Sequence, residues 1–98
     1  MRMVIVIKYE IHPKKSYRRQ YRLLERRGYD MSLLDNVVLM LANGETLPAK
    51  YRDHPLKGDK SGYRDCHIKD DWVLVYRIDK NVLTLVLSET GTHSDILQ

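Results

Sequence analysis

Three histidines in the second half of the sequence, His54, His67 and His93, are the residues best suited to carry chemistry. Imidazole readily accepts and donates a proton near neutral pH. Cleavage of RNA without a metal needs two such transfers, because one group takes the proton of the 2′-hydroxyl and another protonates the leaving 5′-oxygen. The fourth histidine, His12, follows the first expected strand and is interpreted as a surface residue. The other three are therefore candidate general acids and bases.

The other residue types that such a reaction needs are also present. Lysine and arginine number 17 against 13 aspartates and glutamates, which gives a net charge of +4 and a pI of about 9.3. A basic chain favours a polyanionic partner, either nucleic acid or an acidic protein, although many small proteins are basic without one. Cations would offset the charge of a pentavalent phosphate, and Trp72 or a tyrosine could stack on an unpaired base.

Two other kinds of site could use the same residues. Three histidines can bind Zn²⁺, but positions 54, 67 and 93 match no short ligand motif, and a helical HExxH pair is absent from the sequence. Cys66 precedes His67 on an expected strand, where adjacent side chains point to opposite faces, so it is interpreted as a buried residue rather than a nucleophile. As the only cysteine, it forms no internal disulfide. We therefore expect no metal and no other cofactor.

The first part of the chain predicts a strand and a basic helix. Residues 3–7 form a continuous, mostly β-branched apolar run, typical of a buried strand. Apolar side chains at i, i+4 and i+7 predict a helix over residues 14–27, with Pro13 suited to its first turn and Gly28 to its end. Most other positions of this helix are cationic, among them Lys14, Lys15, Arg18, Arg19 and Arg22.

A second helix is predicted over residues 32–42, where the apolar side chains form a wide stripe. Ser32 and Asp35 resemble a capping box at its start, and Asn43-Gly44 ends it. Since the link between the two helices is short, we expect them to form an antiparallel pair.

The second half predicts a loop followed by strands. Residues 47–61 contain prolines, a glycine and several cations, which is typical of a loop. Short turns then separate three strands, expected over residues 63–69, 72–79 and 82–87. Residues 91–98 predict a turn and one helical turn.

The expected order is β-α-α-β-β-β, a two-layer α+β fold in one domain over residues 1–98. The helical pair should pack on a largely antiparallel sheet, with the first strand inserted beside a later one. A chain of 98 residues is long enough for one core. The N-terminal apolar run is too short for a signal peptide, and no segment approaches the roughly 20 apolar residues of a membrane span. We therefore expect a soluble, cytoplasmic protein.

Three motifs occur in the order found in the YafQ branch of the RelE-type toxins, which they resemble. Residues 51–58 (YRDHPLKG) resemble a loop of that branch, and residues 63–76 resemble its central hairpin. Residues 91–95 (GTHSD) resemble its C-terminal signature. The resemblance covers the whole chain in length and element order, and it implies the RelE-like microbial ribonuclease fold.

The resemblance implies the toxin of a type II toxin–antitoxin system, a ribosome-dependent mRNA interferase that cuts mRNA in the A site through the 2′-hydroxyl. The matching motifs imply a catalytic set of His54, His67, Asp71 and His93, with Trp72 in the substrate site. We expect His54 to act as the base and His93 as the acid, with Asp71 orienting or sharing a proton. The implied partners are the ribosome, mRNA and a DinJ- or RelB-like antitoxin with a ribbon-helix-helix part, which would mediate any contact with operator DNA.

Three positions depart from the pattern of that branch. Leu97, expected in the substrate site, stands where an aromatic residue is usual, and Asp70 stands where proline is frequent. Glu89 stands where an arginine is common. The cation that stabilises the phosphate is then expected among the residues Arg52, Lys57, Lys60 and Arg64.

The basic helix is open to two interpretations, a solvated surface or a binding face. As a binding face, its residues Lys14, Lys15, Arg18, Arg19 and Arg22 are expected to contact an acidic segment of the antitoxin. Glu89 and Leu97 leave open a non-catalytic module of the same fold that only binds protein or nucleic acid. A zinc-dependent hydrolase is a third hypothesis, based on the three histidines.

Overall fold

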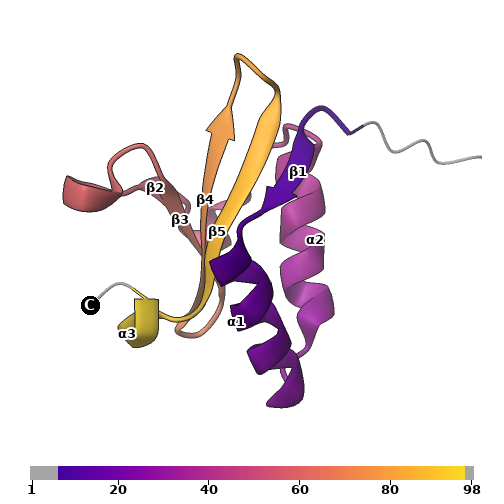
Figure 1. Ribbon diagram of the computed structural model, residues 1–98, viewed down its shortest axis with the longest axis vertical. Helices are drawn as coiled ribbons and strands as arrows, with labels where there is room; N and C mark the ends of the chain where they lie inside the picture. Colours follow the sequence, from indigo (N-terminus) through magenta and orange to yellow (C-terminus); the bar gives the residue numbers. More distant parts are fainter. Residues whose placement is uncertain (1–6, 97–98) are drawn as a thin grey trace, which may run out of the picture.

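The computed structural model describes residues 7–96, which form a five-stranded sheet with helices packed against it (Figure 1). In chain order the elements are β1 (Glu10–Pro13), α1 (Lys15–Arg26), α2 (Met31–Ala42), the 3₁₀ helix η1 (Ala49–Tyr51), β2 (His54–Pro55), the 3₁₀ helix η2 (Gly58–Lys60), β3 (Arg64–Lys69), β4 (Trp72–Asp79), β5 (Thr84–Thr92) and α3 (His93–Ile96). Within residues 7–96 the strand order is β1-β5-β4-β3-β2, and only the β1–β5 pair is parallel. The expected α+β class and mainly antiparallel sheet are confirmed.

The first strand differs in position from the one expected. Residues 3–6 of the expected strand lie outside the described residues, and the strand that the structure describes is β1. It pairs with β5, so a first strand inserted beside a later one is confirmed. Pro13 ends this strand instead of starting the helix, because the Lys14 amide still donates to the Leu87 carbonyl at 2.8 Å and continues the pairing.

The two long helices lie close to the expected ranges, but α2 starts differently. Gly28, at φ +84°, ends the turn after α1, with the Tyr29 amide donating to the Leu24 carbonyl at 3.1 Å. The N-cap of α2 is Asp30, whose carboxylate accepts a hydrogen bond from the Ser32 amide at 3.1 Å. The expected capping box at Ser32 is therefore wrong, because the chain is extended at Asp30 and already helical at Met31.

The last strand is longer than expected because α1 covers part of its edge. The first half of β5 pairs with β1, and the second half faces α1. There Ser16 donates its hydroxyl hydrogen to the Ser88 carbonyl at 2.7 Å, and the Thr90 amide donates to Gln20 Oε1 at 3.0 Å. These side chains satisfy edge groups that a strand partner would otherwise bind, so the polar residues 88–92 continue the strand. The expected start of this strand at Val82 was wrong, since residues 80–83 form the turn between β4 and β5.

The β3–β4 hairpin shows which side chains lie on each face of the sheet. β4 lies over the range expected for it, and β3 starts one residue later than expected. Asp70, at φ +52°, lies in the turn between them, and a register shift follows His67. On β4, Leu74 and Tyr76 pack in the main core with α1 and α2, while Val73 and Val75 are buried on the opposite face. In the described part of the chain, no helix is long and apolar enough to cross a membrane.

Candidate active site

The three histidines expected to carry chemistry converge on the sheet face opposite the main core. His54 comes from β2, His67 from β3 and His93 from the start of α3. The rings of His67 and His93 are stacked with centroids 6.1 Å apart, and those of His54 and His67 lie 6.4 Å apart. His54 and His93 are exposed, and His67 is half-buried. The fold thus brings into one cluster three groups that can transfer protons, although their residues lie far apart in the sequence.

The C-terminal histidine is tied to the β3–β4 turn through the backbone. The His93 amide donates to the Asp71 carbonyl at 2.7 Å. This bond connects the end of β5 to the turn that follows β3, and so brings His93 beside His67. Asp71 therefore contributes a backbone contact, and its side chain lies on the exposed turn.

A buried carboxylate lies beneath the histidines. Asp65 is fully buried, and within residues 7–96 neither carboxylate oxygen has a hydrogen-bond partner. Its backbone pairs with that of His54, and His54 Nε2 lies 3.6 Å from Asp65 Oδ2. Burial raises the pKa of Asp65, while the positive charge of protonated His54, His67 and His93 would lower it. A negative charge here would stabilise a protonated histidine above it.

Asp65 was not among the acidic residues singled out from the sequence. Asp65 and His67 are two positions apart on β3, so both side chains reach the same face. This alternation was the signal in the sequence that could have identified Asp65, although it does not show which face of the sheet holds His54 and His93.

The orientation of His54 is set by the residue two positions before it. His54 Nδ1 lies 2.7 Å from the Arg52 carbonyl. Since a carbonyl oxygen only accepts, Nδ1 must carry the hydrogen in this contact. Arg52 adopts the left-handed conformation, with φ 48° and ψ 41°, which turns its carbonyl toward the ring. The arrangement leaves Nε2 of neutral His54 as a proton acceptor on the side of Asp65.

The segment that carries His54 is anchored from the opposite face by Asp53. The Asp53 carboxylate accepts hydrogen bonds from the Tyr76 hydroxyl at 2.6 Å and from Arg64 Nε at 3.2 Å. Burial, followed by the hydrogen bond to Asp53, raises the pKa of the Tyr76 phenol. Arg64, expected to bind substrate, is thus placed in an ion pair on the core side of β3.

A second ion pair lies on the histidine side of the sheet. Lys60 of η2 reaches Glu89 of β5, with Nζ 3.1 Å from Oε2. Glu89 pairs with Val75, which pairs with Asp65, so the carboxylate of Glu89 belongs to the row that carries His54. With strands about 4.8 Å apart, Glu89 lies about 10 Å across the sheet from Asp65. The cation nearest to Glu89 in the described part is therefore already neutralised.

Residues 9–98 match the family described as "Bacterial toxin of type II toxin-antitoxin system, YafQ". The chain belongs to this family. The "mRNA interferase toxin YafQ" of Escherichia coli K12 is 37% identical over 90 residues, covering 91% of this chain and 96% of that protein. The resemblance to the YafQ branch that the three motifs predicted is confirmed.

Solved toxin structures share the fold. A chain of the E. coli DinJ–YafQ toxin–antitoxin complex superposes with a TM-score of 0.85 at 35% identity, over 94% of this chain and 100% of that one. A metal-bound toxin from Helicobacter pylori superposes with a TM-score of 0.85 at 40% identity, over 91% and 99% of the two chains. In this YafQ-family chain, residues 7–96 contain no group of three His, Cys, Asp or Glu side chains arranged to hold a metal ion.

The remaining residues expected in the substrate site are scattered. Trp72 is buried, with Nε1–H donating to Thr90 Oγ1 at 2.9 Å and its ring edge-on to Tyr29 at 5.1 Å. Arg52 and Lys57 are exposed in the loop around β2. Leu97 lies outside the described residues. The structure therefore places Trp72 in the core, where it supports the turn next to the histidines.

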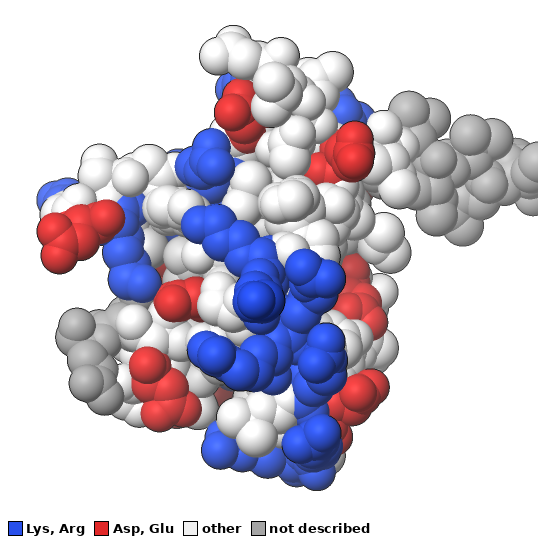
Figure 2. Space-filling view, viewed as in Figure 1, with Lys and Arg blue, Asp and Glu red and all other residues white. Residues whose placement is uncertain are grey.

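The residues expected to bind an antitoxin form a continuous basic surface. Figure 2 shows Lys and Arg side chains gathered over α1, with few acids among them. The exposed members of the expected set are Lys15, Arg18, Arg19 and Arg22. Lys14 is half-buried and donates a hydrogen bond to the Tyr63 hydroxyl at 2.6 Å.

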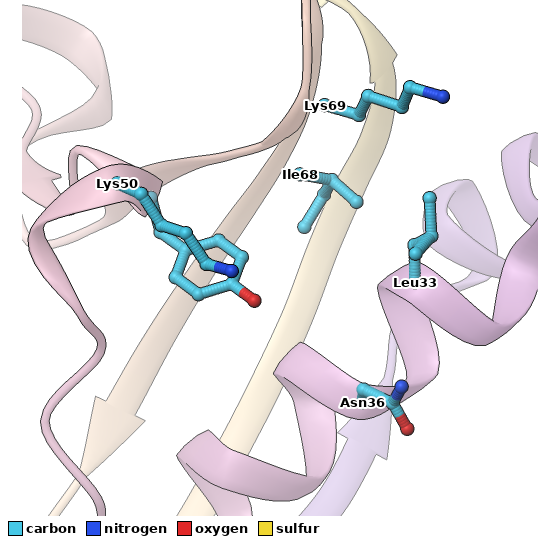
Figure 3. Close-up of a pocket in the computed structure, with 6 residues that line it drawn as sticks. Leu33, Asn36, Lys50, Ile68 and Lys69 are labelled. Carbon is cyan, nitrogen blue, oxygen red and sulfur yellow. The ribbon is translucent and has the colours of Figure 1, made fainter.

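A separate hollow of about 310 Å³ lies between α2, η1 and β3. Leu33, Lys50 and Ile68 are among its lining residues, and Figure 3 shows their side chains around the opening. The ammonium group of Lys50 lies 5.1 Å from the Tyr51 ring centroid. No histidine lines this hollow, so it is distinct from the histidine cluster.

Proposed function

We propose that this chain is an mRNA endoribonuclease that cuts mRNA in the ribosomal A site, by proton transfer through the 2′-hydroxyl and without a metal. The observation that carries the proposal is the cluster of His54, His67 and His93 above the buried carboxylate of Asp65, which accepts no hydrogen bond within residues 7–96. Phosphodiester cleavage needs a base and an acid on opposite sides of the phosphorus, and this cluster supplies both from separate elements. The relatives named mRNA interferase support the same activity.

His54 is the proposed base. Its Nδ1–H is held by the Arg52 carbonyl, so Nε2 can accept the 2′-hydroxyl proton. The 2′-oxygen then attacks the phosphorus to form a cyclic phosphate, and the P–O5′ bond breaks. Asp65, 3.6 Å from Nε2, would stabilise the imidazolium that results.

His93 is the proposed acid that protonates the leaving 5′-oxygen. Its ring is stacked on that of His67 with centroids 6.1 Å apart, and the His67 ring lies 6.4 Å from that of His54. The bond from its amide to the Asp71 carbonyl holds it beside His67. The carboxylate of Asp71, exposed on the turn, remains a candidate for orienting a proton.

The partner we propose is a cognate antitoxin similar to DinJ, which binds YafQ in the E. coli complex. Contact with operator DNA would then occur only through the antitoxin, and the toxin would act in the cytoplasm on translating ribosomes. The proposed contact surface is the basic face of α1, and an acidic antitoxin segment fits its charge.

Primer extension on mRNA from cells that express the protein tests the activity. We expect new 5′ ends with the unaltered protein and their loss with His54→Ala or His93→Ala. His12→Ala is the matched control, because His12 is exposed on β1 and outside the cluster. Cleavage that persisted in both cluster variants would overturn the catalytic assignment. Growth arrest without any new 5′ ends would instead favour a non-catalytic binding module of the same fold.

A further inference from the structure

A cluster of Lys14, Tyr63 and Arg77 lies outside the histidine site. The Lys14 ammonium donates a hydrogen bond to the Tyr63 hydroxyl at 2.6 Å and lies 4.9 Å from the centroid of the Tyr63 ring. The guanidinium carbon of Arg77 lies 5.6 Å from the same centroid. The three residues come from the start of α1, the segment before β3, and β4. The fold, not sequence proximity, brings the two cations to one phenol.

The cluster has an excess of positive charge. Arg77 Nη1 lies 3.7 Å from Asp79 Oδ2, a loose and partly exposed contact that neutralises little of its charge. Lys14 belongs to none of the ion pairs that the described residues form. The Lys14 hydrogen bond, helped by Arg77, lowers the pKa of Tyr63. The surroundings of the phenol therefore favour a negative charge.

The cluster and the histidines share one face of the sheet. On β4, Val73, Val75 and Arg77 occupy alternate positions that point away from the main core. Val73 pairs with His67 of β3. At about 3.3 Å per residue, Arg77 lies about 13 Å along β4 from the His67 row. An RNA strand bound at the histidines could extend along β4 to this cluster.

We propose that Lys14, Tyr63 and Arg77 form a second RNA subsite, which binds a backbone phosphate of the same strand that is cut at the histidines. The proposal rests on the proposed function, because the strand must cross the histidine cluster. The two cations would neutralise one phosphodiester, and the Tyr63 hydroxyl would keep Lys14 in place beside the ring. Lys60, held by Glu89 at the level of Val75, lies between the two sites.

Fluorescence anisotropy with a labelled 2′-O-methyl hexanucleotide tests the subsite, since this probe cannot form a cyclic phosphate. We expect Arg77→Gln and Lys14→Gln each to weaken binding about fivefold, as loss of one contact between unit charges in water predicts. The slope of log affinity against log salt concentration should fall by about 0.7 for the lost phosphate contact. Lys8→Gln is the matched control, because Lys8 also lies beside a tyrosine ring, 5.4 Å from the Tyr9 centroid, and no second cation of residues 7–96 lies over that ring.

Two further measurements identify the ligand. Tyr63→Phe keeps the ring but loses the hydroxyl that holds Lys14, so it should weaken binding less than Arg77→Gln does. A dinucleotide, which reaches only the histidines, should bind the parent and Arg77→Gln equally.

Equal affinity and salt slope for Arg77→Gln and the parent would overturn the proposal, as would the absence of hexanucleotide binding by the unaltered protein. Weaker binding of the variants to 70S ribosomes, with unchanged binding to the hexanucleotide, would assign the cations to ribosomal RNA and overturn it too. If the subsite proposal is wrong but the proposed function is right, the parent protein still produces new 5′ ends. If the proposed function is wrong, the parent protein produces no new 5′ ends.

Discussion

At the scale of single residues, the site depends on a carboxylate that is buried without a donor. Most buried carboxylates in folded proteins accept hydrogen bonds, and an unpaired one lowers stability. Asp65 departs from that rule directly beneath the histidine cluster. Strained or unsatisfied groups concentrate at functional sites, where the cost in stability is offset by activity. We therefore expect the Asp65 carboxylate to lower the stability of the fold while it supports cleavage.

Asp65→Asn should stabilise the fold and lower cleavage. Folding raises the pKa of Asp65, so burial of this carboxyl lowers the free energy of unfolding more and more as the pH rises above the usual pKa of 3.8. The loss is complete once the folded group is ionised. We expect the free energy of unfolding of the variant to be higher by about 1 kcal/mol at pH 8. The increase should be smaller in acid, where protonated histidines offset the charge of Asp65. Urea unfolding at several pH values measures this. Asp59→Asn, on the exposed η2, is the control, and a destabilised D65N at pH 8 would contradict the assignment.

Glu89→Gln should increase cleavage. Removing the carboxylate frees Lys60, whose ammonium now lies 3.1 Å from it, to bind a substrate phosphate. Because the pair is partly exposed, the gain should not exceed about fivefold, the upper end for such pairs. The measurement is the cleavage rate of a programmed mRNA on purified ribosomes, with Glu45→Gln as the control. A slower variant would mean that Glu89 positions Lys60 instead of masking it.

At the scale of elements, the two-residue strand β2 needs support from outside itself. It pairs with β3 at two residue positions, His54 and Pro55, and the Leu56 amide adds one hydrogen bond to the Tyr63 carbonyl at 2.9 Å. Asp53 supplies the missing support, because its carboxylate binds Tyr76 of β4 and Arg64 of β3 on the core side. The base is thus positioned by a contact on the opposite face of the sheet.

Tyr76→Phe should loosen β2 as well as lower stability. The variant loses the 2.6 Å hydrogen bond to Asp53, and a hydrogen bond to a charged group contributes about 2 kcal/mol. We expect a loss of that size in the free energy of unfolding and changed NMR signals of the His54 ring. Tyr51→Phe is the control, because the Tyr51 hydroxyl has no hydrogen bond within the described part of the protein. An unchanged His54 spectrum would show that β2 does not depend on the Asp53 contacts.

At the scale of the whole molecule, charge is distributed unevenly, with Lys and Arg side chains gathered over α1 (Figure 2). We expect the antitoxin complex to weaken as salt rises, since exposed charges are screened within about 8 Å at physiological ionic strength. Neutralising three cations of α1 should weaken it further and flatten the salt dependence: Arg18→Gln, Arg19→Gln and Arg22→Gln. The control changes the same charge elsewhere: Lys8→Gln, Lys50→Gln and Lys80→Gln. Calorimetry at several salt concentrations measures both, and a complex insensitive to salt would argue against an electrostatic contact.

The sequence by itself determined the elements whose signals are local. The apolar faces of α1 and α2, the stop at Gly28 and the range of β4 follow from periodicity and turn residues within a few positions. The three histidines were also evident, because their chemistry depends on residue type alone. Helix starts and strand ends were less predictable, as at Asp30 and Val82, because they depend on contacts with distant segments.

Only the tertiary structure decided which side chains share a face and which charges are already paired. The register of β3 against β2 puts Asp65 under His54, and the contacts of α1 along β5 extend that strand to Thr92, directly before His93. Arg64 and Lys60 look alike in the sequence, yet one is bound by Asp53 on the core side and the other by Glu89 on the histidine side. These pairings join residues far apart in the chain, and a strand shifted by one position would reverse every face. Residue type therefore limits what chemistry is possible, while register selects the groups that can meet to perform it.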